Sequence, residues 1–332
     1  MADLLIPTDR GLYCPAGNFY VDPHKPVELA VVTHAHSDHA RRGCGAYLTA
    51  AIGVPTLQLR VGEKARIDGL PFGQSIVHNG VRVSLHPAGH ILGSAQVRIE
   101  YRGEVWVVSG DYKTVADPTC DAYEPVRCDT FITESTFGLP IYRWRANNEL
   151  VDEINAWWRG NVEQRRTSVI LAYSLGKAQR VLGMLDPAIG PILIHPAVEP
   201  FYRTYQQAGI ALPPAQCVDL DSARRSRGRG VLVAPSLPMD ADWRAALGEI
   251  SVATASGWMQ VGSMRKRAGA DFGFVVSDHA DWEGLLSACR ETGATRVLVT
   301  HGYTEVLSRY LNEQGVQSEV LHFPRIEVTR SA

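Results

Sequence analysis

Three histidines and an aspartate lie within six residues of this chain, in the stretch Thr33-His34-Ala35-His36-Ser37-Asp38-His39. The apolar residues 29–32 directly before it are predicted to form a buried strand, so the stretch lies where a strand ends at the rim of a sheet. Imidazoles and a carboxylate suit zinc or another borderline divalent ion. The first two histidines can share one metal ion, while Asp38 and His39 can point to a second. The pattern predicts a metal centre; the alternative is a solvated loop rich in histidine.

Length and composition are those of an ordinary globular protein. The 332 residues can bury a large core and suffice for two domains or for one domain with a large insertion. Charged residues make up 20% and hydrophobic residues 45%, and no apolar run approaches membrane-spanning length. The six cysteines lack CxxC spacing, which argues against a disulfide framework and a thiolate zinc site. Because the chain also starts without a basic region, we expect a cytoplasmic protein.

The charge balance restricts how nucleic acid would be bound. A net charge of −2 argues against a general nucleic-acid coat but permits a local basic groove. Any one basic cluster is typical of a solvated face, whereas several near one metal site would favour a polyanionic substrate. The clusters are Arg41-Arg42, Arg165-Arg166, Arg224-Arg225 with Arg227 and Arg229, and Arg265-Lys266-Arg267.

A second histidine motif follows another predicted strand. Residues 81–85 alternate as a half-buried strand should, and they lead into His86-Pro87-Ala88-Gly89-His90-Ile91-Leu92-Gly93-Ser94. The glycines on both sides of His90 permit a tight turn that returns the ring to the sheet edge. His86 lies inside the strand pattern and is predicted to be structural. We therefore expect His90 to be the metal ligand.

Two aspartates are candidates for the same centre. Residues 96–101 and 104–108 are predicted to form a hairpin that ends in Ser109-Gly110-Asp111. Alone, Asp111 would be interpreted as a turn residue, but beside the other candidates it is expected to be a ligand that can bridge two metals. Asp22, in Asp22-Pro23, is either a turn residue or a carboxylate that orients a ligand imidazole.

The rest of the chain alternates between strand and helix patterns. Residues 146–159 are predicted to form a helix, and several apolar runs between about 168 and 253 are predicted to be buried strands, which together indicate an α/β domain with a parallel sheet. Near the end, residues 272–276 lead into Ser277-Asp278-His279, and 296–299 lead into Thr300-His301. Each pair of strand and histidine precedes a helical pattern. We expect both histidines to return to the rim of the first sheet.

These motifs together resemble a known family. The run at 34–39, Gly-His90-x-x-Gly-Ser and Ser-Gly-Asp111 resemble the metallo-β-lactamase fold in its phosphodiesterase branch. Thr133-Glu134-Ser135-Thr136, Leu175-Gly176-Lys177-Ala178-Gln179 and the two late histidines narrow the resemblance to the β-CASP nucleases. The opening Pro7–Cys14 and the length are similar to those of bacterial DNA-ligase-associated exonucleases, relatives of Artemis and the DNA crosslink-repair nucleases.

The resemblance implies an architecture and a set of site residues. The implied fold is α/β, a metallo-β-lactamase αββα sandwich from residues 1–138 and 275–332 with an inserted α/β β-CASP cap at 139–274. Two divalent metal ions, zinc or manganese, are implied. One is held by His34, His36, His90 and Asp111, and the other by Asp38, His39, Asp111 and His301. The implied catalytic residues are Asp38, Asp111, Glu134, which matches the acidic residue positioning the late catalytic histidine, and His279, which matches that histidine.

The implied function is a metal-dependent phosphodiesterase, a DNA exonuclease acting in repair with an ATP-dependent DNA ligase and a helicase. A hydroxide generated by two metals attacks the phosphodiester and leaves a 5′-phosphate and a 3′-hydroxyl. Lys177, Arg265 and Lys266 are expected to grip flanking phosphates, although the latter pair equally fits a solvated surface. His301 and Glu134 match RNA-processing relatives, because DNA-acting relatives generally lack that histidine and glutamate. An RNA nuclease of the mRNA 3′-end-processing type is therefore the alternative.

Two further classes of protein fit the sequence less well. A catalytically inactive β-CASP scaffold subunit would be expected to have lost ligands, whereas this chain retains every candidate from His34 to His301. A metallohydrolase for small esters or lactams shares the histidine-rich stretch but has no use for the cap.

Overall fold

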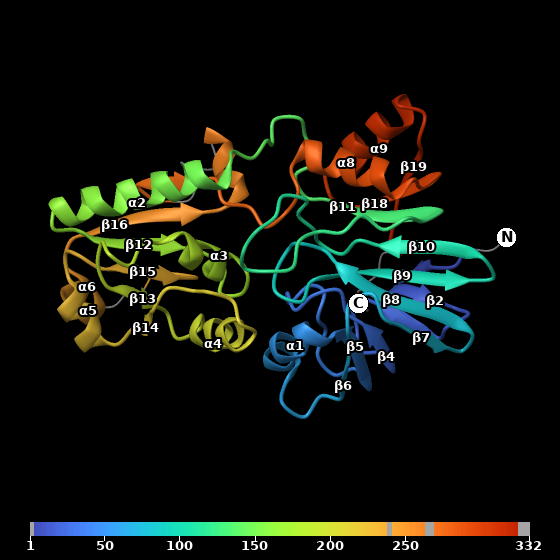
Figure 1. Ribbon diagram of the computed structural model, residues 1–332, viewed down its shortest axis with the longest axis horizontal. Coiled ribbons are helices and arrows are strands. Elements are labelled where there is room, and N and C mark those ends of the chain that lie inside the picture. Colours follow the sequence, from blue (N-terminus) through green and yellow to red (C-terminus); the bar gives the residue numbers. More distant parts are fainter. Residues whose placement is uncertain (1–2, 238–240, 263–268, 325–332) are drawn as a thin grey trace, which may run out of the picture. The chain divides into compact units, whose positions relative to one another are not determined.

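The computed structural model describes residues 3–237, 241–262 and 269–324. The chain forms two compact units. Unit 1 comprises the residues up to Ala116, Cys120–Ile141 and the residues from His279 onward. Unit 2 comprises Asp117–Thr119 and Tyr142–Asp278. Each unit contains both helices and sheets (Figure 1), which confirms the mixed α/β class expected from the sequence.

Unit 1 contains two sheets. The strands of sheet 1 lie in chain order and are β1 (Ile6–Thr8), β2 (Gly11–Cys14), β3 (Phe19–Val21), β4 (Leu29–Val31), β5 (Ala46–Ala50) and β6 (Ile67–Leu70). The strands of sheet 2, in spatial order, are β19 (Gln317–Val320), β18 (Arg296–Gly302), β11 (Thr130–Ser135), β10 (Glu104–Val108), β9 (Ala95–Tyr101), β8 (Val81–Pro87) and β7 (Ser75–His78).

Alternating side chains explain why sheet 2 is covered on both faces. In β10, Trp106 and Val108 join a core that sheet 1 also lines, while Val107 joins a second core formed with helices. Those helices are α8 (Trp282–Thr292) and α9 (Thr304–Glu313), which lie beside β11 and β18 in Figure 1. Because successive strand residues point to opposite faces, one strand serves both cores.

The predicted hairpin is present at residues 95–108. β9 and β10 pair antiparallel with Tyr101 opposite Glu104. The two turn residues, Arg102 and Gly103, have φ values of 52° and 84°. Positive φ at both central residues is the geometry that matches the right-handed twist of paired strands, and glycine adopts it without steric cost.

Unit 2 is built around one parallel sheet, as the strand and helix alternation predicted. Its neighbouring strands all pair in parallel within the described part of the chain. In spatial order the strands are β14 (Gln216–Cys217), β13 (Ile192–Ile194), β15 (Val231–Ala234), β12 (Thr167–Leu171), β16 (Ile250–Ala255) and β17 (Phe272–Phe274).

Helices cover both faces of this sheet. One face packs against α2 (Asn147–Glu163), α3 (Lys177–Met184) and α4 (Glu199–Gln207). The other face packs against α5 (Leu220–Ser226) and α6 (Ala241–Leu247). Burial on both faces explains why β15, for example, is an uninterrupted apolar run in the sequence.

The remaining helices of residues 3–237, 241–262 and 269–324 that can be given bounds are short. They are η1 (Ala51–Gly53) and α1 (Val54–Val61) in unit 1 and η2 (Gly257–Gln260) in unit 2. Among the described residues, no helix has both the length and the apolar content that a membrane crossing requires.

Candidate functional site

Most candidate site residues of unit 1 lie at one edge of sheet 2. Strands β8, β10, β11 and β18 run in the same direction, so their carboxyl ends meet at that edge. His90 and Asp111 follow β8 and β10, while Glu134 and His301 lie in the last residues of β11 and β18. Side chains carried by the carboxyl ends of neighbouring parallel strands converge, which is why ligand sites recur at such edges.

The histidine-rich stretch reaches this edge from sheet 1. It follows β4, and the Thr33 carbonyl accepts a 2.8 Å hydrogen bond from the Ala95 N–H at the start of β9. A Cβ on Gly110, whose φ is +55°, would lie only 2.6 Å from the Thr33 Cβ. Glycine at this position therefore allows the loop and Asp111 to approach each other.

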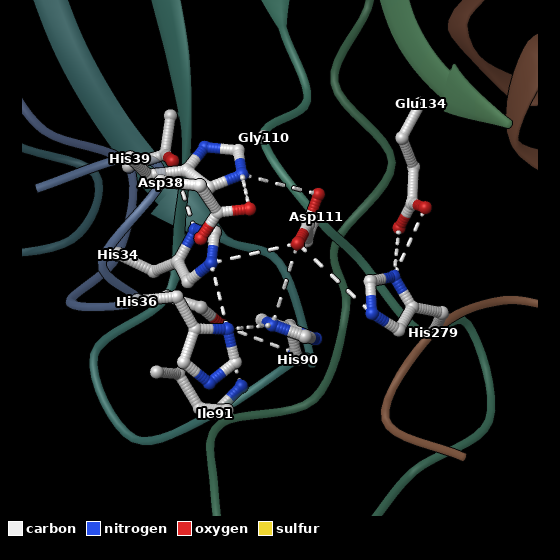
Figure 2. A network of polar contacts seen from close by, with 12 residues as sticks. His34, His36, Asp38, His39, His90, Ile91, Gly110, Asp111, Glu134 and His279 are labelled. Carbon is white, nitrogen blue, oxygen red and sulfur yellow. Dashed lines mark hydrogen bonds and ion pairs between the residues drawn. The ribbon is translucent and has the colours of Figure 1, made fainter. Parts of the chain in front are cut away.

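Four donor side chains converge at this point (Figure 2). His34, His36, His90 and Asp111 each offer one ligand atom, and these atoms all lie within 4.8 Å of one another. His36 Nδ1 is 3.1 Å from Nε2 of both His34 and His90. Asp111 Oδ2 is 3.5 Å from His34 Nε2 and 3.7 Å from His90 Nε2. Three imidazoles and one carboxylate are a donor set that fits zinc or a similar divalent ion.

The other oxygen of Asp111 faces a second group of donors. Asp111 Oδ1 lies 3.6 Å from His39 Nε2, and His39 Nε2 lies 3.7 Å from Asp38 Oδ2. The Asp38 side chain is 70% exposed, whereas that of Asp111 is only 10% exposed. One buried carboxylate therefore presents an oxygen to each group, which is the arrangement expected of a bridging ligand.

His301 lies beside the second group, but its side chain is exposed and belongs to no donor group found among the described residues. Its ring centroid is 5.7 Å from that of His39, and its Nδ1 is 3.1 Å from Thr300 Oγ1. His301, Asp38, Asp111 and Glu134 nevertheless line one pocket of about 50 Å³. That volume accommodates a few water molecules.

Asp22 contacts the histidine-rich stretch directly. Its Oδ2 lies 2.7 Å from His39 Nδ1 and accepts a 2.6 Å hydrogen bond from the Thr33 hydroxyl, while Oδ1 accepts one of 2.8 Å from the Thr33 N–H. Its backbone also turns, with φ at +44°. Asp22 therefore lies at a backbone turn and contacts the His39 imidazole, and its role in orienting a metal ligand stays a prediction.

Burial and neighbouring charges shift the pKa values of His34 and His39 in opposite directions. Burial, together with the nearby imidazoles of His39 and His90, holds the pKa of His34 well below its usual range. Burial also disfavours the charged form of His39, but the carboxylates of Asp111 and Asp22 outweigh it and raise the pKa of His39 to about 10. Near neutral pH and without a metal, His34 is therefore neutral and His39 carries a proton.

A second arrangement adjoins the cluster. His279 Nδ1 lies 2.8 Å from Glu134 Oε1 and 3.0 Å from Oε2, as Figure 2 shows. The other ring nitrogen, Nε2, is 4.0 Å from Asp111 Oδ2. Glu134 is 2% exposed and also accepts a 2.9 Å hydrogen bond from the Tyr112 N–H. Burial opposes its ionisation, but the adjacent His279 and these hydrogen bonds keep the pKa of Glu134 below its usual value.

Relatives of this chain are found among DNA ligases and RNA-processing factors. A probable DNA ligase of Opitutus terrae is 32% identical over 312 residues, which cover 93% of this chain and 30% of that protein. Cleavage and polyadenylation specificity factor subunit 3 of Dictyostelium discoideum is 32% identical, and Endoribonuclease YSH1 of Kluyveromyces lactis 29%. Each of these two matches covers 36% of this chain and 16% of the relative.

These matches support the predicted resemblance to the β-CASP metallo-β-lactamase nucleases. The chain spans less than a third of the length of these relatives. A crystal structure of a protein of unknown function from Enterococcus faecalis V583 shares the fold of this chain, with a TM-score of 0.61 and 12% identity over 90% of this chain and 79% of that one. No family model matches the sequence.

The structure corrects the predicted environment of one residue that was expected to bind phosphate. Lys177 was expected to present its ammonium to flanking phosphates, but its side chain is only 5% exposed and its Nζ lies 2.6 Å from Asp278 Oδ1. A buried ammonium held by a carboxylate cannot reach a phosphate without breaking the pair. Arg265 and Lys266 lie outside the described residues.

Sequence reasoning missed two side chains that hold the backbone next to the donor residues. The Ser94 hydroxyl accepts hydrogen bonds from the N–H groups of His90 and Ile91, at 3.0 and 3.1 Å. Arg60, on α1, donates through Nε to the Ala35 carbonyl at 2.9 Å. Ser94 was visible in the Gly-His-x-x-Gly-Ser motif, but 25 residues separate Arg60 from Ala35 and no local pattern links them.

Proposed function

We propose that this protein is a metal-dependent nuclease, a DNA exonuclease acting in DNA repair. The observation that carries the proposal is the place of Asp111 between two groups of imidazole donors and the pair Glu134 and His279. Divalent ions held by such a donor set would stabilise the charge of a phosphoryl group. An imidazole held by a carboxylate beside them would transfer a proton to the leaving group.

The proposed domains follow the family architecture. We assign residues 1–138 and 275–332 to the metallo-β-lactamase domain and 139–274 to the β-CASP domain. The boundaries between the two compact units fall nearby, at 141/142 and 278/279. The core shared by the two sheets of unit 1 supports assigning them to an αββα sandwich.

The proposed metal ligands form two sets that share Asp111. His34, His36 and His90 complete the first set, and Asp38, His39 and His301 complete the second. When bound, two divalent ions, zinc or manganese, would supply a water of lowered pKa and neutralise charge on the phosphoryl oxygens. Asp38, His39 and His301 lie outside the donor groups found among the described residues, and the ring centroids of His39 and His301 are 5.7 Å apart.

The proposed role of His279 follows from its two ring nitrogens. Glu134 accepts a hydrogen bond from Nδ1–H, which fixes the tautomer and directs Nε2 towards the site. From there, Nε2 donates its proton to the leaving oxygen or a hydrogen bond to the scissile phosphate. The carboxylate of Glu134 stabilises the charged imidazole, and the products are a 5′-phosphate and a 3′-hydroxyl.

Two observations point to different nucleic acids. The match to the probable DNA ligase of Opitutus terrae extends over 93% of this chain, which supports DNA as the substrate and a partnership with a DNA ligase. That the ligase is ATP-dependent and that a helicase takes part are further points of the proposal. The matches to the RNA-processing factors cover only 36%. Glu134 and His301 nevertheless keep RNA cleavage of the 3′-end-processing type as the second candidate. The proposed location is the cytoplasm, which the six free cysteines support.

A comparison of labelled substrates tests the proposal. Single-stranded DNA and RNA of one sequence, labelled at either end, are incubated with purified protein and defined amounts of zinc or manganese. The expected result is progressive shortening of DNA from one end, with RNA intact and no product from the Asp111→Ala protein. Cleavage of RNA alone would favour the second candidate. Cleavage of neither, with bound metal demonstrated, would refute the proposal.

Replacing Asp22 with asparagine is expected to weaken metal binding about 10- to 100-fold, as is typical when a ligand imidazole loses the carboxylate that orients it. Asparagine tolerates the positive φ of Asp22, so the change isolates the carboxylate. Titration with a competing chelator measures the affinity. Asp9→Asn, which removes an exposed carboxylate paired with Lys25, should leave it unchanged. Equal affinity in Asp22→Asn and wild type would refute the orienting role.

Metal binding at pH 8 is expected to release the proton held by His39. Between its unfolded pKa of about 6.5 and its folded pKa of about 10, metal-free protein holds a proton that the unfolded chain does not. The stability from this charge is complete below the lower value and disappears as pH rises through the upper one. A ligand imidazole must be neutral, so the metal displaces the proton.

Calorimetry in two buffers with different ionisation enthalpies counts the protons released. His39→Gln should release about one proton fewer than wild type. His86→Gln, which changes an imidazole bonded to Ser84 instead, should not differ from wild type. An unchanged count in His39→Gln would contradict the assignment.

A further inference from the structure

Helix α3 begins with two buried positive charges. The side chains of Lys177 and Arg180 are 5% and 1% exposed. Lys177 Nζ lies 2.6 Å from Asp278 Oδ1, and Arg180 Nε lies 3.1 Å from Asp117 Oδ2. Both carboxylates are as buried as their partners, at 3% and 1%. The Leu175–Gln179 motif, left without a role once Lys177 proved to be buried, thus starts a helix that bears two internal ion pairs.

Such pairs contribute little to stability. Removing two charges from water costs several kcal/mol per ion, and well-packed apolar residues of similar volume are often equally stable or more stable. The two buried pairs of α3 are therefore not explained by the stability of unit 2. Each pair instead fixes the orientation of one side chain relative to its partner, because the two groups bond in a defined geometry.

Both cations act on the residues directly before His279. Lys177 holds the Asp278 side chain, and Arg180 donates through one terminal nitrogen to the Ser277 carbonyl at 2.5 Å. Residues 275–281 form neither helix nor strand, since β17 ends at Phe274 and α8 begins at Trp282. No regular backbone ladder fixes this segment, so individual contacts determine its path.

The residue after His279 is also held. The Ala280 N–H donates a 2.6 Å hydrogen bond to the Tyr112 carbonyl, and the N–H of Tyr112 donates to Glu134. Asp281 then caps α8 by accepting from the Gly284 N–H at 2.9 Å. The backbone of His279 is therefore fixed on its carboxyl side by the same network that contains Glu134, and on its amino side by Lys177 and Arg180.

We propose that Lys177 and Arg180 are positioning residues of the nuclease: through Asp278 and Ser277 they fix the backbone of His279, so that its imidazole meets Glu134 and faces the site. The inference rests on the proposed function, because it gives these residues a role in the reaction assigned to His279. Neither residue contacts substrate or metal in this role. A displacement of about 1 Å at a catalytic group can lower a rate by about 100-fold, so distant positioning has a measurable effect.

The central variant removes both charges of one pair. Lys177→Met/Asp278→Asn leaves no unpaired buried charge, so its unfolding temperature should stay close to that of wild type. Its kcat should fall about 10- to 100-fold, while KM and bound metal remain unchanged. Lys177→Arg keeps the charge and should retain most of the wild-type rate. Lys177→Met alone leaves a buried carboxylate unpaired and should lose both stability and rate.

A matched control separates positioning from general loosening of unit 2. Asn161→Ala removes a buried side chain of α2 that donates to Ser168 on β12 at 3.0 Å. It should lower the unfolding temperature of the protein without changing kcat. A loss of kcat in Asn161→Ala equal to that in the double variant would overturn the inference, as would a wild-type kcat in the double variant.

Amide hydrogen exchange tests the positioning without relying on activity. Exchange in a peptide covering 275–281 should accelerate about tenfold or more in Lys177→Met/Asp278→Asn and remain unchanged in Asn161→Ala. Unchanged exchange in the double variant would overturn the inference even if wild type is an active nuclease. Accelerated exchange in a protein that cleaves no nucleic acid would refute the proposed function while supporting the fixed path of residues 277–279.

Discussion

Replacing Asp111 with asparagine is expected to lower phosphodiester cleavage by about 10³-fold or more and to reduce the bound metal. The carboxylate is the one group among the described residues that faces both sets of donors, with Oδ2 near His34 and His90 and Oδ1 near His39. Asparagine keeps the shape of the side chain but removes its charge and one of its two oxygens. The change therefore weakens both proposed metal positions together.

The measurement combines single-turnover cleavage with metal analysis of the same protein sample. Asp68→Asn, an exposed carboxylate of β6, is the control for a change in net charge. It should match wild type in rate and metal content. If Asp111→Asn binds a full complement of metal and cleaves at the wild-type rate, the shared-ligand assignment is wrong.

Removing the imidazole of His279 is expected to lower kcat about 10²- to 10⁴-fold, the usual contribution of a general acid, with metal content unchanged. Glu134→Gln should produce a smaller loss, because the amide oxygen still accepts a hydrogen bond from Nδ1–H but no longer stabilises a charged imidazole. Metal content decides between this role and another, because Asp111, Glu134 and His279 also form a group close enough to hold an ion. Metal loss in His279→Ala would identify a ligand instead of a proton donor.

A substrate with a good leaving group separates the two proposed roles of His279. A p-nitrophenyl ester of thymidine 5′-phosphate releases a phenolate that needs no proton. If His279 protonates the leaving oxygen, His279→Ala should cleave this ester at a rate within a few-fold of wild type, while remaining slow on DNA. Equal losses on both substrates would show that His279 binds the scissile phosphate instead.

Local sequence patterns were sufficient to predict most helices and strands and the donor group of His34, His36, His90 and Asp111. Alternating residues predicted β8 and the β9–β10 hairpin, and the structure has strands there. The histidine-rich stretch, His90 and Asp111 could be recognised because each follows a predicted strand. Strands that run in the same direction bring their carboxyl ends to one edge of a sheet. The mixed α/β class is confirmed, and the matches to relatives support the predicted resemblance to β-CASP nucleases.

Side-chain environments that depend on distant partners were not predictable in the same way. Lys177 follows a glycine at a strand-to-helix turn, where a phosphate-binding lysine is common, but its partner Asp278 lies 101 residues away. The sequence alone does not show whether a charged side chain will be buried in the folded protein. For His301, the sequence placed the residue at the correct strand end, yet its positive φ and exposed ring are properties of the folded turn.

The parallel pairing of β11 with β18 has a consequence for protein synthesis. Thr130 pairs with Arg296 and Glu134 with Thr300, so the middle of sheet 2 joins segments that leave the ribosome far apart in time. A nascent chain that has emerged only to residue 270 already carries the histidine-rich stretch, His90, Asp111 and Glu134, but neither His279 nor β18. Most of the proposed metal donors are therefore synthesised before His279, the proposed proton donor, and before β18, which pairs with β11.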